Sequence, residues 1–288
     1  MLTNMYGYPD LIYQAMLKWI DEHQSDGISV TELIDSPLIW HLKKEYGTKA
    51  DVQEQWKAFW GSVKHKFFGY LPEGKYHIEQ SLRLIIDDQL ITGTPDVWTT
   101  NQLMDFKNTS VESYQYHKND DSWLLQLNIY RYLIWKVFNI AIPTLTSVVA
   151  FDNWSQQKSV YDKSYPRKAS IEVNQPIMSF EDIEKYLKER IKLFHNAKDY
   201  ICTSENRWDK PTQYAVRKIT SSKCIKLCDT VDEAEFVISQ KSDPLIYTYD
   251  VRIGESERCE RWCPVRHVCP LKEQFESPSE KNIVTIYV

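Results

Sequence analysis

Apolar residues recur every three or four positions along the first quarter of the chain, with few helix breakers between them. This spacing places the apolar residues on one face of an α-helix, which has 3.6 residues per turn. The pattern is clearest in "YQAMLKWIDEHQ" (13–24), "SPLIWHLKKEYG" (36–47) and "VQEQWKAFWGSVKHKFFGYL" (52–71). The sequence therefore predicts several helices, with a helical N-terminal segment over 1–54.

The pattern changes between residues 76 and 109, where short apolar or alternating runs are separated by Asp-Asp and Thr-Thr-Asn turn signals. Such runs predict three strands in a meander. The strands are "YHIEQSLRLIID", "QLITGTPDVWTT" and "QLMDFKNT". Residues 122–139 then predict a helix that is apolar nearly all round and hence buried. A strand over 144–154 and an amphipathic helix over 180–201 follow.

The tail beyond residue 201 is chemically distinct because it contains all six cysteines. The runs "QYAVRKI", "KCIKLC", "EAEFVIS" and "LIYTYDVR" predict a small α/β element, which "RCERWCPVRHVCP" closes. We therefore expect three parts: the helical segment over 1–54, a core over 55–200 and a cysteine-rich subdomain over 201–288.

Composition limits the classes of partner. A chain of 288 residues that is 42% hydrophobic can bury a substantial core. The net charge of -5 gives no global basic field, so a nucleic acid would have to bind in a local groove. No apolar run approaches the roughly 20 residues of a membrane span, and the N-terminus lacks a signal-peptide layout. We expect a cytoplasmic protein with no membrane partner.

Candidate catalytic residues lie in "ITGTPDVWTTNQLMDFKNTS", which spans two of the predicted strands. Asp96 falls at the end of one strand and Asp105 in the next. Asp105 and Lys107 share a strand face because side chains alternate along a strand. Two carboxylates and an ammonium group suit metal-assisted phosphodiester hydrolysis, since hard divalent cations prefer carboxylate oxygens. An exposed hairpin with an ordinary Asp-x-Lys pair is the alternative.

Four motifs together resemble the PD-(D/E)xK nucleases, in particular their RecB-like branch. They are "GSVKH" (61–65), "GTPD" (93–96), "DFK" (105–107) and "QLNIY" (126–130), in the order and structural context of that family. The match covers about 55–135, and "LIDSPLIWHLKK" resembles the helical segment that precedes it. The whole chain is similar to phage-encoded members with a C-terminal cysteine cluster, for which the host cytoplasm is the expected location.

The resemblance implies an α/β fold with a restriction-endonuclease-like core, in which a mixed central sheet is flanked by helices. The helical N-terminal segment and a cysteine-clasped C-terminal subdomain flank that core. The resemblance also implies that His65, Asp96 and Asp105 bind Mg²⁺ or Mn²⁺, with the main-chain carbonyl of Phe106 as a further ligand.

The remaining motif residues have implied roles beside the metal. Lys107 would be the catalytic lysine. Gln126 and Tyr130, one helical turn apart on one face, would hold DNA or order the catalytic groups, unless they are polar members of a packed helix. Glu79 is an alternative metal-facing residue, although a role on the strand surface is the simpler interpretation.

The cysteines give a second candidate site. Cys259, Cys263 and Cys269 form a Cx3Cx5C pattern that is similar to the CxxCx5C of RecB-like enzymes with an iron-sulfur cluster. In those families the fourth cysteine precedes the core, but none does here, so Cys202 is the first choice. Cys224 and Cys228 compete with it, although a strand would make them small buried hydrophobes.

The cysteine site could hold a 4Fe-4S cluster or a structural Zn²⁺ ion, because four thiolates suit both. The resemblance favours iron-sulfur, and His267 could replace one cysteine as a zinc ligand. The expected function is metal-dependent DNA hydrolysis, exonucleolytic or on single strands, in recombination, repair or phage DNA processing. The alternatives are a catalytically silent nucleic-acid-binding module and an interaction subunit that docks onto a helicase, replication or recombination protein.

Overall fold

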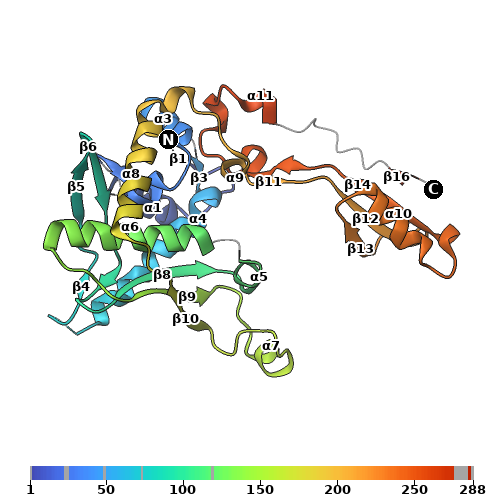
Figure 1. Ribbon diagram of the computed structural model, residues 1–288, viewed down its shortest axis with the longest axis horizontal. Helices are drawn as coiled ribbons and strands as arrows, with labels where there is room; N and C mark the ends of the chain where they lie inside the picture. The colour runs from blue at the N-terminus through green and yellow to red at the C-terminus, as the bar shows by residue number, and fades with distance from the viewer. Residues whose placement is uncertain are drawn as a thin grey trace. The chain divides into compact units, whose positions relative to one another are not determined.

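The computed structural model describes residues 2–22, 26–47, 50–72, 74–117, 120–275 and 285–286. In it the chain divides into two compact units (Figure 1). The first comprises Met1–His41 and Ala50–Tyr200, and the second comprises Leu42–Lys49 and Ile201–Val288. Each unit contains a β-sheet and its own cluster of buried hydrophobic residues.

Helices open the first unit, as the apolar spacing predicts. They are α1 (Asp10–Glu22), α2 (Val30–Leu33), α3 (Pro37–Tyr46), α4 (Val52–Lys64) and the 3-10 helix η1 (His65–Tyr70). Helix α2 begins with a capping box, in which Ser29 Oγ accepts from the N–H of Glu32 and the Glu32 carboxylate accepts from the N–H of Ser29. Strands β1 (Leu2–Thr3) and β3 (Ala50–Asp51) pair in parallel.

A five-stranded sheet in the order β10-β9-β8-β7-β4 forms the centre of the first unit. The strands are β4 (His77–Ile78), β7 (Val97–Trp98), β8 (Leu103–Thr109), β9 (Leu145–Phe151) and β10 (Ser170–Gln175). Strands β8 and β9 are parallel and the other pairs are antiparallel, so the sheet is mixed. The fold is therefore α/β, as expected.

Helix α6 (Asp120–Phe138) connects β8 to β9 and is buried nearly all round, as its apolar sequence predicts. It contacts β8 and β9 of the five-stranded sheet and also β5 (Leu82–Ile86) of a second sheet. Helix α8 (Phe180–His195) packs against it, while α5 (Val111–Gln115) and α7 (Gln156–Tyr161) are short. The position of α6 brings its polar residues to the face of β8.

The predicted meander over 76–109 is wrong as a single sheet. Strand β5 forms a hairpin with β6 (Gln89–Gly93), and both belong to a separate three-stranded sheet with β2 (Ile28–Ser29). The break falls at Thr94-Pro95-Asp96, since proline has no N–H to continue a ladder. The chain therefore changes sheets immediately before Asp96.

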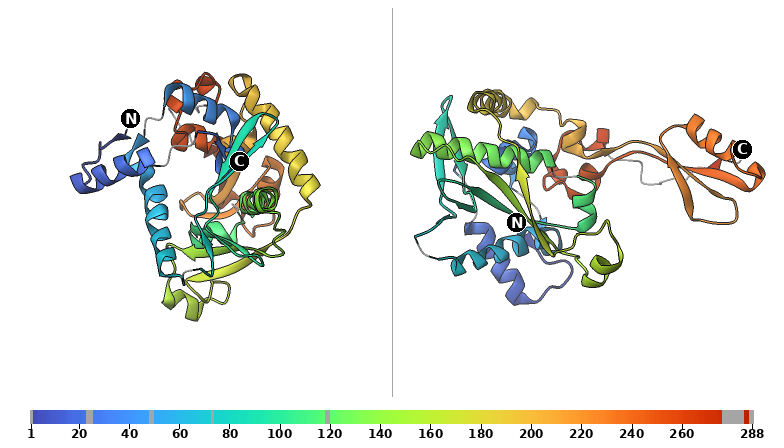
Figure 2. Two further views of the ribbon diagram at one scale, coloured as in Figure 1. Left: turned by 90° about the vertical axis from the view of Figure 1, so that its left-hand side faces the viewer. Right: turned by 60° about the horizontal axis from the view of Figure 1, so that its bottom comes forward.

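The second unit contains the small α/β element that the sequence predicts. Strands β12 (Gln213–Lys218), β13 (Cys224–Cys228), β14 (Tyr247–Arg252) and β16 (Thr285–Ile286) form a sheet in the order β13-β12-β14-β16, with α10 (Val231–Ser239) packed against it (Figure 2). The cysteine-bearing part consists of α9 (Ser204–Arg207), β11 (Asp209–Lys210), β15 (Glu255–Ser256), the π-helix η4 (Arg258–Trp262), the 3-10 helix η5 (Arg266–Val268) and α11 (Lys272–Phe275). Two further 3-10 turns are η2 (Ala197–Asp199), which belongs to the first unit, and η3 (Pro244–Ile246), which belongs to the second.

No helix in the ranges that the structure describes has the length and apolar character needed to cross a membrane.

Candidate functional site

Asp96 is a buried carboxylic acid at the point where the chain enters β7. Its Oδ2 accepts a hydrogen bond of 2.6 Å from the main-chain N–H of Phe106. Burial, with the negative charge of Asp105, raises the pKa of Asp96 to about 8, against the opposing effects of that hydrogen bond and of Lys107. In the absence of a cation, Asp96 is therefore mostly protonated below pH 8.

Asp105 and Lys107 lie on one face of β8, as the alternation of side chains predicts. Lys107 Nζ is 2.6 Å from Asp105 Oδ2, in an ion pair whose two side chains are largely buried. Apart from this ion pair, Asp105 Oδ2 accepts no hydrogen bond within the part of the chain that the structure describes. This buried oxygen keeps its capacity to bind a cation.

Helix α6 supplies two polar residues to the same place. Lys107 Nζ donates a 2.6 Å hydrogen bond to Gln126 Oε1, and Gln126 Nε2 donates to the hydroxyl of Tyr130 at 3.2 Å. Burial and the charge of Asp105 raise the pKa of Tyr130 well above its ordinary value, so the phenol stays protonated. The polar chain thus runs from Asp105 through Lys107 and Gln126 to Tyr130.

The close approach of α6 depends on Gly93 at the end of β6. A Cβ atom at this position would lie 2.8 Å from Cε1 of Tyr130 and 3.0 Å from a methyl carbon of Val30. Both distances are shorter than van der Waals contact. The glycine of the "GTPD" motif therefore makes room for Tyr130.

Phe106 lies between the two charged residues in sequence, but its ring packs elsewhere. The ring centroids of Phe67 and Phe68, both from η1, are each 4.8 Å from that of Phe106. These contacts anchor the middle of β8 by its apolar side chain. Phe106 contributes to the polar site through its main chain, by the N–H that binds Asp96.

The structure thus brings together Asp96, Asp105, Lys107, Gln126 and Tyr130, with the main chain of Phe106 beside them. His65 begins η1, and its side chain lies outside the described residues.

Glu79 lies closer to the acidic site than its strand pattern indicates. Its main-chain N–H donates a 2.9 Å hydrogen bond to the carbonyl oxygen of Asp96, and its charge contributes to the raised pKa of Asp96. Glu79 has φ of 44°, a left-handed conformation that is uncommon for a residue other than glycine. No local sequence signal predicts this conformation.

The acidic residues suit a divalent cation in chemistry, because carboxylates and a main-chain carbonyl are hard oxygen ligands. The elevated pKa of Asp96 shows that a second negative charge beside Asp105 is unfavourable without a further cation. As they stand, however, the residues that the structure describes include no group of three or more His, Cys, Asp or Glu side chains arranged to hold a metal ion.

Four cysteines of the second unit interact with one another. Burial and the nearby thiols of Cys263, Cys202 and Cys269 raise the pKa of Cys259 to about 11. Burial also raises the pKa of Cys263, with smaller contributions from Cys269 and Cys202. The structure therefore places Cys202 near the other three, although these thiols are not arranged as a metal site. Four neighbouring thiols form a donor set of the type that zinc and iron-sulfur clusters use.

The competing residues lie in other surroundings. Cys228 is buried in the hydrophobic cluster of the small sheet, and Cys224 is half-buried on the same strand. The pairing register between β12 and β13 shifts next to Cys224, so the two cysteines do not follow one simple alternation. Cys224 contributes to the raised pKa of Cys228, which has burial as its main cause. His267 is exposed on η5.

Comparison with known proteins adds little. No family model and no curated protein matches the chain. Among solved structures, the chain is similar to the one titled "Crystal structure of SSO0001", with 15% sequence identity and a TM-score of 0.43. The similarity covers 69% of this chain and 88% of that chain. A similarity of this size says nothing about function, so the functional proposal rests on the site.

Proposed function

We propose that this protein is a divalent-metal-dependent nuclease that hydrolyses DNA phosphodiester bonds. It acts as an exonuclease or on single strands, in recombination, repair or phage DNA processing. In this proposal the first unit has the restriction-endonuclease-like core of the PD-(D/E)xK superfamily. The parallel pairing of β8 with β9 through α6, within a mixed sheet, supports that core.

The proposal rests on one observation, which is the pair of buried carboxylic acids beside Lys107. Asp96 is 7% exposed and Asp105 is 2% exposed. Burying two neighbouring acids costs stability unless a partner compensates their charge, and such arrangements are concentrated at functional sites. A structural ion pair with Lys107 would need only one carboxylate, so the second buried carboxylate, that of Asp96, supports a cation site.

Mg²⁺ or Mn²⁺, when bound, would activate the attacking water and neutralise charge on the scissile phosphate. Asp96 and Asp105 would hold it, with the carbonyl of Phe106 and the imidazole of His65 as further ligands. Lys107 would contact the phosphate or the nucleophile, and its bond to Gln126 fixes the direction of its ammonium group. Tyr130 would support Gln126 in this position.

The second unit, in the same proposal, binds a 4Fe-4S cluster through Cys202, Cys259, Cys263 and Cys269, with structural Zn²⁺ as the alternative. The mutual effect of these thiols on the pKa of Cys259 supports this grouping. The bound group would stabilise the cysteine-bearing segments, because metal–thiolate bonding contributes directly to folding free energy. We assign it no electron transfer in catalysis.

Incubation of anaerobically purified full-length protein with end-labelled single-stranded and double-stranded DNA tests the nuclease. Cleavage with Mg²⁺ or Mn²⁺, and none with a chelator, is the expected result. Since an imidazole ligand suits manganese better than magnesium, we expect higher activity with Mn²⁺ and a smaller preference in His65→Ala. DNA binding without cleavage in either metal would instead favour a catalytically silent binding module.

A further inference from the structure

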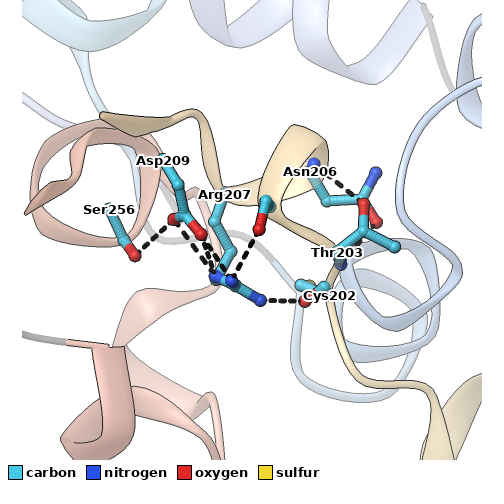
Figure 3. A network of polar contacts seen from close by, with 7 residues as sticks. Cys202, Thr203, Asn206, Arg207, Asp209 and Ser256 are labelled. Carbon is cyan, nitrogen blue, oxygen red and sulfur yellow. Dashed lines mark hydrogen bonds and ion pairs between the residues drawn. The ribbon is translucent and has the colours of Figure 1, made fainter. Parts of the chain in front are cut away.

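The guanidinium group of Arg207 contacts the main chain of Cys202 and the carboxylate of Asp209 (Figure 3), and it also lies over the ring of Phe275. Its Nη1 donates to the main-chain oxygen of Cys202, and its Nε lies 3.1 Å from both carboxylate oxygens of Asp209. The guanidinium carbon lies 4.2 Å from the ring centroid of Phe275, in the helix that follows Cys269. One side chain therefore touches the segment of Cys202 and the segment after Cys269.

Asp209 links the segment of Cys202 to a third segment, which is the one that carries Cys259. Ser256 Oγ donates a 2.6 Å hydrogen bond to Asp209 Oδ1, and the two residues are paired across β11 and β15. Ser256 ends β15, shortly before the π-helix η4 that contains Cys259. Next to Cys259, Arg258 donates back from Nη1 to the main-chain oxygen of Asn206 at 3.2 Å. The segments of Cys202 and Cys259 are thus joined by two side-chain hydrogen bonds in addition to the pairing of β11 with β15.

None of these contacts uses a sulfur atom. The side chain of Arg207 is only 15% exposed and that of Asp209 is 27% exposed, so solvent screens this ion pair less than it would a surface pair. The guanidinium group matches the carboxylate with two donors, which fixes direction as well as distance. The segments can therefore be held together before any metal is bound.

We propose that Arg207, Asp209 and Ser256 form a metal-independent clasp that positions Cys202 for the cluster. This inference rests on the cysteine half of the proposed function. Cys202 is remote in sequence from Cys259, Cys263 and Cys269, and closing so long a loop costs conformational entropy. The clasp offsets that entropic cost when the chain folds, so Cys202 already lies near the other three thiols before metal binds.

Replacement of Arg207 by lysine tests the clasp, because lysine keeps the charge and loses the two-donor geometry. The matched control is Arg217→Lys. Arg217 makes an equivalent pair with Asp250 in the same unit, at 2.7 and 2.9 Å, and its side chain is also 15% exposed. We would titrate the metal-free parent and both variants anaerobically with Co²⁺ and follow the thiolate-to-cobalt charge-transfer absorption.

We expect Arg207→Lys to bind Co²⁺ at least about tenfold more weakly, as for other residues that orient metal ligands. Its charge-transfer absorption at saturation should also be lower, since fewer thiolates reach the ion. Arg217→Lys should match the parent in both. Equal affinity and equal absorption in Arg207→Lys and the parent would overturn the proposal, as would an equal loss in Arg217→Lys.

Alkylation of Cys202 in the metal-free protein, measured by mass spectrometry, provides a readout that needs no metal. Arg207→Lys should speed this reaction several-fold, and Ser256→Ala, which removes one hydrogen bond only, should speed it less. If Arg207→Lys does not fold, the alkylation rate of Cys202 in Ser256→Ala, compared with that in the parent, still tests the clasp. An unchanged rate in Ser256→Ala would contradict the clasp.

The same preparations are assayed for Mg²⁺-dependent DNA cleavage. A parent that binds no Co²⁺ through thiolates would overturn both the cysteine site and the clasp, whatever its nuclease activity. Conversely, absent cleavage with normal Co²⁺ binding would contradict the nuclease proposal and leave the clasp intact. The two failures are therefore distinguishable.

Discussion

The main-chain N–H of Phe106 donates a 2.6 Å hydrogen bond to Oδ2 of Asp96. This bond links the start of β7 to the middle of β8 and places Asp96 beside Asp105. Phe106 is in turn anchored by Phe67 and Phe68, whose ring centroids are each 4.8 Å away. The hydrogen bond and the ring contacts together hold the backbone that carries Asp96 and Asp105.

The first prediction concerns the pH dependence of stability. The pKa of Asp96 is raised from its ordinary value of 3.8 to about 8, so the folded protein holds this proton more tightly than the unfolded chain does. The free energy of unfolding of the metal-free protein should therefore fall as the pH rises from 4 to 8, with a contribution of up to about 1.4 kcal/mol per pH unit. Urea unfolding at several pH values measures this slope.

Asp96→Asn should remove this contribution, because asparagine cannot ionise and its oxygen can still accept from Phe106. At pH 8 without metal we expect the variant to be more stable than the parent, by up to about 1.4 kcal/mol for each pH unit between 4 and 8, while losing cleavage, as stability and activity often conflict at such sites. A parent and variant with the same slope of stability between pH 4 and 8 would contradict the assignment of a buried, protonated Asp96.

The second prediction concerns catalysis by β8. Asp105→Asn and Lys107→Met should each lower DNA cleavage at least about a hundredfold, the usual cost of losing a principal electrostatic contributor. Glu172→Gln provides the matched control, since Glu172 is an exposed carboxylate on β10 of the same sheet. Its activity should equal that of the parent in a single-turnover assay with Mg²⁺. Undiminished cleavage by Asp105→Asn would refute the proposed site.

The third prediction concerns the glycine beneath α6. Gly93→Ala places a methyl group 2.8 Å from Tyr130 Cε1, so Tyr130 must move away from Gln126 or the helix must shift. Overpacking of this kind costs about 1–3 kcal/mol, and cleavage should fall because the support of Gln126 is disturbed. Urea unfolding and the cleavage assay measure the two effects.

Gly61→Ala serves as the control for Gly93→Ala. Gly61 lies inside α4, and a Cβ atom there would meet no atom within 4 Å. Alanine should therefore stabilise the protein by about 0.5–1 kcal/mol, because it restricts the unfolded chain and favours the helix. If both variants were equally stable, close packing of Tyr130 on Gly93 would be disproved.

Much of the polar site follows from sequence periodicity. The alternation of a strand predicts that Asp105 and Lys107 share a face, and the helical repeat predicts that Gln126 and Tyr130 do so. The structure shows both pairs in contact. These relationships are local, since each depends only on the type of secondary structure around the residues.

The features that the sequence does not predict depend on contacts between distant segments or on short signals. The change of sheet at Pro95 depends on which partner strand is nearest, and periodicity does not contain that information. Strand β10 has only two apolar residues, Ile171 and Val173, so its alternation is too short to stand out. The clasp of Arg207 needs residues from β11 and β15, which come together only in the folded chain.

The last prediction concerns the ligands of the cysteine cluster. Cys202, Cys259, Cys263 and Cys269 interact with one another, whereas Cys228 is buried in the core of the small sheet. We expect anaerobically prepared protein to be brown and to contain iron, and each of the four changed to Ser to lose metal and melt at a lower temperature.

Cys224→Ser and Cys228→Ser are the matched controls and should keep the metal, although Cys228→Ser loses apolar packing. Because the pKa of Cys259 is raised to about 11, metal uptake must displace protons, and affinity for added metal should increase with pH over the range where folding is unchanged. Metal analysis of all six variants decides the ligands: full metal content in Cys202→Ser, with loss in Cys224→Ser or Cys228→Ser, would identify a different fourth ligand. A colourless protein with stoichiometric zinc would replace the iron-sulfur cluster and retain the same four thiolates.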